Sequence, residues 1–75
     1  MIQAGALQAI RGGRRGVHLV CRSRPGRILE GIHAFETQAG WIVQTRHLDG
    51  SPGPNVYASD CTALERTYEE GPDAD

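Results

Sequence analysis

The segment GVHLVCRSRPGRILEGIHAFE, residues 16–36, decides the fold. Apolar and polar side chains alternate through residues 16–22, which is the pattern of a β-strand with one buried face. Residues 23–26 read Ser-Arg-Pro-Gly and predict a turn with the type II signature, because Pro25 presets φ for the second position of such a turn and Gly26 allows the positive φ of the third. A second strand follows over residues 27–36, so the segment predicts an antiparallel hairpin.

The second strand of this hairpin has apolar side chains on both faces. Ile28 and Ile32 lie on one side, and Leu29 and Phe35 lie on the other. Gly31 stands between them, where a bulge or sharp bend would reverse which face points inward. A strand of this kind is typical of a small barrel in which strands pass from one sheet to the other.

Two more strands are expected at residues 41–48 and 55–59, on either side of the loop Asp-Gly-Ser-Pro-Gly-Pro at 49–54. The pattern changes at Asp60, which can cap a short 3₁₀ turn by accepting backbone N–H groups. A fifth short strand is then expected over residues 65–68.

The sequence therefore predicts a mainly β fold, a small SH3-like barrel of four to five antiparallel strands with one short helical turn near the C-terminus. Seven apolar residues are expected in one core: Val17, Leu19, Ile28, Ile32, Val43, Val56 and Leu64.

A chain of 75 residues forms one domain at most. We expect the barrel to span residues 16–68, after a flexible basic arm at 1–15 and before a disordered acidic tail at 69–75. The apolar residues of the arm share one face if it is helical: Ile2, Ala6, Ala9 and Ile10. However, glycine at position 5 costs a helix roughly 1 kcal/mol relative to alanine, and so short a helix is marginal in water.

The charges are separated along the chain, and every basic residue is an arginine. Six arginines and one glutamate give the first 34 residues a charge of +5, and two arginines and eight acids give the remainder −6. Such a basic segment can bind the phosphates of nucleic acid or an acidic protein. Tyr57 joins the candidates because it faces outward if Val56 faces inward. The candidate binding residues are Arg11, Arg14, Arg15, Arg22, Arg24, Arg27 and Tyr57.

A second hypothesis is a protein–protein adaptor or self-assembling structural module, which would use a sheet edge or the face of Trp41 and Tyr57. Trp41 itself fits the core better than a ligand groove. Because a chain this short buries a small core, weak homo-oligomers are also expected.

Catalytic, cofactor and metal sites are not expected. The three histidines, His18, His33 and His47, lie within predicted strands and have no acid or base partner nearby in the sequence. Cys21 and Cys61 fit free buried thiols, since the spacings of metal ligands are missing. No run approaches the ~20 apolar residues of a membrane span, and no secretory signal is visible, so a cytoplasmic protein without a membrane partner is expected.

Residues 26–66 resemble small SH3-like proteins of bacteria and their prophages, most of which have no known function. The resemblance rests on Gly40-Trp41-Ile42-Val43, the Pro/Gly loop, Val56-Tyr57 and Leu64. Arginine-only usage with many Gly and Ala residues also fits a GC-rich bacterial or phage genome.

The same stretch is similar to the plasmid-borne type II dihydrofolate reductases, which are SH3-like barrels that form tetramers around a pore. Ala63-Leu64-Glu65-Arg66 matches their chain ending, and Val56 meets the first residue of their Val-Gln-Ile-Tyr pore motif. Tyr57, Ala58 and Ser59 occupy the rest of that motif, and the required lysine is absent from the chain. The resemblance therefore implies the fold and not the pore chemistry, and a tetrameric pore enzyme is the third hypothesis.

Overall fold

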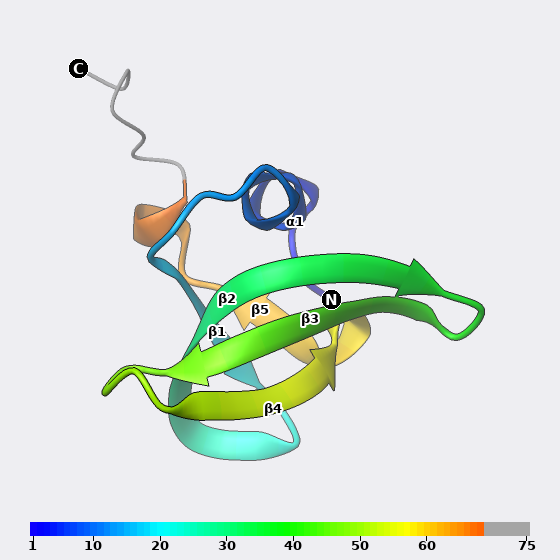
Figure 1. Cartoon of the computed structure of the whole chain (residues 1–75). Coiled ribbons are helices and arrows are strands. Elements are labelled where there is room, and N and C mark those ends of the chain that lie inside the picture. Colours follow the sequence, from blue (N-terminus) through cyan, green and yellow to red (C-terminus); the bar gives the residue numbers. More distant parts are fainter. Residues whose placement is uncertain (69–75) are drawn as a thin grey trace.

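A computed structural model describes residues 1–68 and shows one sheet of five antiparallel strands in the order β4-β3-β2-β1-β5 (Figure 1). The elements in chain order are α1 (Ala4–Arg11), β1 (Val17–Cys21), β2 (Arg24–Thr37), β3 (Gly40–His47), β4 (Pro52–Tyr57), η1 (Ala58–Asp60), β5 (Cys61–Ala63) and η2 (Glu65–Thr67). The mainly β fold predicted from the sequence is confirmed. Over the described residues the sheet bends without closing, since β4 and β5 end it on opposite sides.

The tight turn between β1 and β2 comes earlier than the sequence predicts. Cys21 pairs with Arg24, so Arg22 and Ser23 make the connection, and residues 25–27 bulge out of β2 before Ile28 pairs with Val20. The strands are thus connected before Pro25 and Gly26, whereas Gly26 does have the positive φ expected for it, 78°.

Asp60 explains where this turn falls. Its Oδ2 accepts the Ser23 N–H at 3.1 Å and also the Ser23 hydroxyl, which fixes Ser23 in the connection. The carboxylate therefore ties the β1–β2 hairpin to η1, in place of the capping role expected for it.

The bulge predicted at Gly31 is confirmed by a shift in the β2–β3 register between Gly31 and His33. Leu29 faces inward before it and Ala34 faces inward after it. Glycine is also required here for space, because a Cβ atom would stand 2.6 Å from Cδ1 of Ile10. The missing side chain lets α1 pack directly on the backbone of β2.

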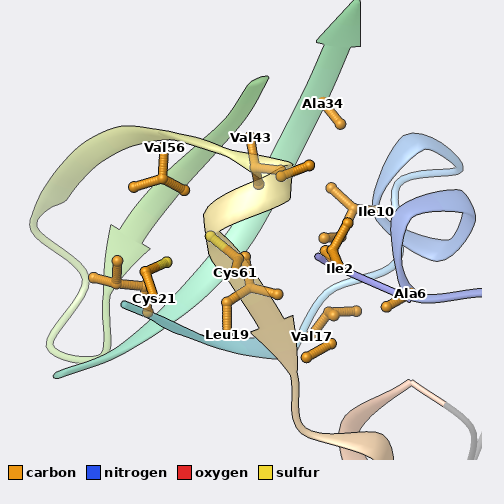
Figure 2. Packing of buried hydrophobic residues seen from close by; sticks show 13 residues of the cluster. Ile2, Ala6, Ile10, Val17, Leu19, Cys21, Ala34, Val43, Val56 and Cys61 are labelled. Carbon is orange, nitrogen blue, oxygen red and sulfur yellow. The ribbon is translucent and has the colours of Figure 1, made fainter. Parts of the chain in front are cut away.

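The core lies between the bent sheet and α1 (Figure 2). Of the seven predicted core residues, Val17, Leu19, Val43 and Val56 are buried, whereas Ile32 is half-buried. Ile28 is 42% exposed and Leu64 37% exposed, so these two predictions are wrong. The bulge at residues 25–27 puts Leu29 on the inner face of β2, which turns its neighbour Ile28 outward.

The N-terminal segment differs most from the expectation of a flexible arm at residues 1–15. Ile2, Ala6 and Ile10 are buried on one face of α1. The Ile2 N–H donates to the Ala58 carbonyl at 2.8 Å. Residues 2–11 are thus part of the folded domain. A helix this short is marginal alone in water, and packing against the sheet stabilises it.

Gln3 extends this attachment to the unpaired edge of β5. Its side-chain amide donates to the Ala63 carbonyl at 3.0 Å and accepts the Ala63 N–H at 2.9 Å. The amide therefore satisfies the two backbone groups that a neighbouring strand would bind.

The order of the last elements also differs from the prediction. The 3₁₀ turn η1 comes before β5, which pairs with β1, and residues 65–67 form a second 3₁₀ turn where a strand was expected. The acidic tail expected at residues 69–75 lies outside the described residues. In the described part of the chain, no helix has the length and apolar character needed to cross a membrane.

Candidate functional site

The three arginines before β1 interact with other groups of the same chain. The guanidinium carbon of Arg11 lies 4.6 Å from the centre of the Trp41 ring, a cation–π contact. Arg14 is half-buried and donates from Nη1 to the carbonyl oxygen of Tyr68. Arg15 is exposed, and its charge contributes to lowering the pKa of Glu30. These three candidates surround one end of α1 and do not converge on an open site.

Glu30 and Arg46 form an ion pair where β2 meets β3. Both Nε and Nη2 of Arg46 donate to Oε1 of Glu30, at 3.0 and 2.5 Å, and the Gly16 N–H donates to Oε2 at 2.7 Å. The hydrogen bonds from Arg46 are the main cause of the lowered pKa of Glu30, followed by the one from Gly16. Arg46 is therefore neutralised inside the molecule.

Arg22 lies at the turn of the β1–β2 hairpin, and its Nε is 3.6 Å from Oδ1 of Asp60. The Ser23 hydroxyl, then the Ser23 N–H and Arg22 hold the pKa of Asp60 below its usual range. This arginine is highly exposed, so its ion pair is open to solvent and weak.

Arg24 and Arg27 line a hollow at the open end of the sheet, between the β1–β2 hairpin and the start of β4. The hollow has a volume of about 410 Å³. We call it the hairpin hollow, and its lining residues are Ser23, Arg24, Pro25, Arg27, Leu29, His47 and Pro54. Neither Arg24 nor Arg27 forms an ion pair with a carboxylate of residues 1–68. The hairpin hollow therefore presents two uncompensated guanidinium groups beside buried Leu29.

His47 was not among the predicted site residues. It is the last residue of β3, on the same face as buried Val43 and Thr45, and the half-buried ring reaches the hollow beyond the end of the core. The alternation of residues in this strand could have predicted His47 as a site residue, because it puts a polar ring on the inner face at the end of the strand.

Tyr57 lies apart from the hairpin hollow, on the outer face of the sheet. It is 50% exposed while its neighbour Val56 is buried, so the orientation inferred from the sequence is confirmed. Trp41 packs partly against the core, as expected, and also borders a second hollow of about 470 Å³ with Met1 and Leu7.

The remaining reactive side chains are potential metal ligands and the two cysteines. Residues 1–68 hold no group of three or more His, Cys, Asp and Glu placed to bind a metal ion. Cys21 and Cys61 are buried directly opposite one another on β1 and β5. Burial, followed by contact with Cys21, raises the pKa of the Cys61 thiol, which therefore stays protonated.

Comparisons of the chain with protein-family models, curated proteins and solved structures find no match.

Proposed function

We propose that this chain is a noncatalytic binding module that holds the phosphate backbone of nucleic acid in the hairpin hollow. The observation that carries the proposal is the pair Arg24 and Arg27, which line one open hollow without a carboxylate partner in residues 1–68. The proposal keeps the SH3-like family and a bacterial or phage cytoplasm as its setting, because both resemblances in the sequence point there.

The chemistry of the hollow suits a phosphodiester. A guanidinium group offers several N–H donors in one plane and pairs with two phosphate oxygens at once. His47 also lines the hollow, and its ring adds a hydrogen-bond donor or acceptor. Buried Leu29 is an apolar part of the lining, and charge-assisted hydrogen bonds are stronger beside apolar side chains than in open water.

An acidic protein would satisfy the same charges, so a second feature must favour nucleic acid. Exposed flat rings on the outer face of the sheet, Phe35 and Tyr57, supply it. Bases bind such rings whatever their sequence, whereas acidic side chains gain little from them.

The test is fluorescence anisotropy of a labelled 12-nucleotide single strand, titrated with the full chain at several salt concentrations. The double variant Arg24→Gln/Arg27→Gln should bind more weakly. Its plot of log affinity against log salt should be shallower by about 1.4, since each phosphate neutralised on a single strand contributes roughly 0.7.

The matched control is Arg15→Gln/Arg66→Gln, which removes the same charge from two exposed arginines outside the hollow. Equal losses in the two double variants would overturn the proposed site. Absence of binding by the unaltered chain at 20 mM salt would overturn the function.

A further inference from the structure

Three apolar side chains form a row across the outer face of the sheet, on neighbouring strands. Phe35 of β2 pairs with Ile42 of β3, and Ile42 pairs with Tyr57 of β4. Directly paired residues on one face have their side chains about 4.5 to 5.5 Å apart, so the three lie in contact range. Phe35 is 39% exposed and Tyr57 is 50% exposed, so a large part of each aromatic side chain is open to solvent.

A polar row runs beside this apolar one. His33 pairs with Gln44, and Gln44 pairs with Asn55, each two residues from its apolar counterpart in the same strand. The rings of His33 and Phe35 are stacked, with centres 6.2 Å apart and planes inclined by 29°. Gln44 and Asn55 are exposed amides, each able to donate and accept hydrogen bonds. The platform, as we call the two rows together, thus combines flat rings with adaptable polar groups.

The charges around the platform favour a polyanion. The only carboxylates of β2, β3 and β4 are Glu30 and Glu36. Glu30 is held by Arg46, and Glu36 lies opposite Trp41 on the other face of the sheet. The platform therefore carries no free carboxylate, and the end of β3 beyond it leads to the uncompensated arginines of the hairpin hollow.

The edge beside the platform argues against a protein strand as the occupant. β4 begins Pro-Gly-Pro at residues 52–54, and proline has no N–H to donate to an added strand. An extended peptide could add hydrogen bonds over only part of this edge, whereas bases require none from it.

We propose that the platform binds the unstacked bases of a single-stranded nucleic acid whose phosphates extend to the hairpin hollow. This inference rests on the proposed function and specifies its ligand. Ile42 and His47 are five residues apart in β3, which is roughly 17 Å at about 3.4 Å per residue, and their side chains point to opposite faces of the sheet. A strand bound to the platform therefore reaches the hairpin hollow by passing around the end of β3, which requires several nucleotides. A duplex keeps its base faces stacked against each other and cannot use the rings.

Three 12-unit probes separate the bases from the backbone: an oligodeoxythymidine, an abasic phosphodiester of the same length, and a duplex. The full chain should bind the thymidine strand at least about fivefold more tightly than the abasic strand, because one stacked base contributes about that factor or more. The duplex should bind no better than the abasic strand.

Substitutions then assign the effect to the platform. Tyr57→Leu keeps an apolar side chain without a flat ring, and should lower affinity for the thymidine strand about fivefold or more while leaving the abasic strand unaffected. Tyr57→Phe should retain the affinity. Leu64→Ala is the control, since Leu64 is an exposed apolar residue outside the platform. Circular dichroism melting verifies that each variant is folded.

The possible failures are distinguishable. Equal binding of thymidine and abasic strands, unchanged by Tyr57→Leu, overturns the platform and leaves the hairpin hollow standing. Tight duplex binding also overturns it. If none of the three probes binds at low salt, the proposed function and this inference fall together.

Discussion

Two groups of arginines stand on either side of β1, and the fold treats them differently. Arg11 and Arg14 are engaged by Trp41 and the Tyr68 carbonyl. Arg24 and Arg27, only a strand away in sequence, line a hollow and meet no carboxylate in the described chain. The sequence presents both groups as one basic segment, because it shows charge and not how charge is compensated.

This difference teaches where to look for a binding site in a small, arginine-rich chain. A guanidinium group that a fold has already neutralised has little left to offer a ligand. The residues worth altering first are those that folding leaves exposed and uncompensated, and the expected effects below follow this division.

The largest effect should come from detaching the helix that carries the first group. Ile10→Ala removes a fully buried side chain that packs on Gly31, and should lower the free energy of unfolding by about 2 to 5 kcal/mol. Urea denaturation followed by circular dichroism measures it. Gln8→Ala, at an exposed position of the same helix, should have little effect. A loss of less than about 1 kcal/mol for Ile10→Ala would favour the flexible arm expected from the sequence over a docked helix.

A smaller effect is expected at the ion pair that neutralises Arg46. Glu30→Gln weakens charge-assisted hydrogen bonds to a carboxylate that is 9% exposed, and should cost about 1 to 3 kcal/mol at neutral pH. The lowered pKa of Glu30 gives the sign of the pH dependence. Its stabilisation is present above the ordinary value of 4.5 and is lost as the pH falls through the lowered value.

Thermal melting between pH 7 and pH 3 tests this dependence. The unaltered chain should lose more stability on acidification than the Glu30→Gln variant. The exposed control Glu65→Gln should follow the unaltered chain. Parallel curves for the unaltered chain and Glu30→Gln would show that the pair does not stabilise the fold.

The smallest effect separates the two arginine groups directly. Arg14→Gln removes a hydrogen bond to a backbone carbonyl and should cost about 0.5 to 1.5 kcal/mol of stability. Arg24→Gln should stay within about 0.5 kcal/mol, because its side chain is exposed and meets no carboxylate. Affinity for single-stranded DNA should show the reverse order. Equal effects of both substitutions on stability and on binding would remove the distinction.

Much of the fold follows from local patterns. Alternation predicts β1 and β3, and glycine at position 31 predicts the bulge in β2. The docked helix does not follow, because its stability comes from the backbone space above Gly31, which no local signal reveals. The elements after Tyr57 are three residues long, too short to carry a period, so their order was predicted wrongly.

The candidate site was predictable in part. Arg24 and Arg27 follow from charge alone. His47 and Leu29 reach the same hollow only because bulges set which residues face inward, and a shift of one residue exchanges the faces of a strand. The sequence also predicts binding roles for Arg11 and Arg14. Their intramolecular partners, Trp41 and Tyr68, lie far along the chain, so no local pattern shows that these arginines are already engaged.

Gln3 and Ile2 have a consequence for the order in which the molecule assembles. The Gln3 amide meets Ala63 across 60 positions of sequence, and Ile2 meets Ala58. Contacts this distant form late, because closing the intervening chain costs entropy before it gains anything. During synthesis the N-terminal residues emerge first. Residues 2 and 3 cannot make these contacts until residues 58–63 have been synthesised, so α1 docks on the sheet only after the later strands are present.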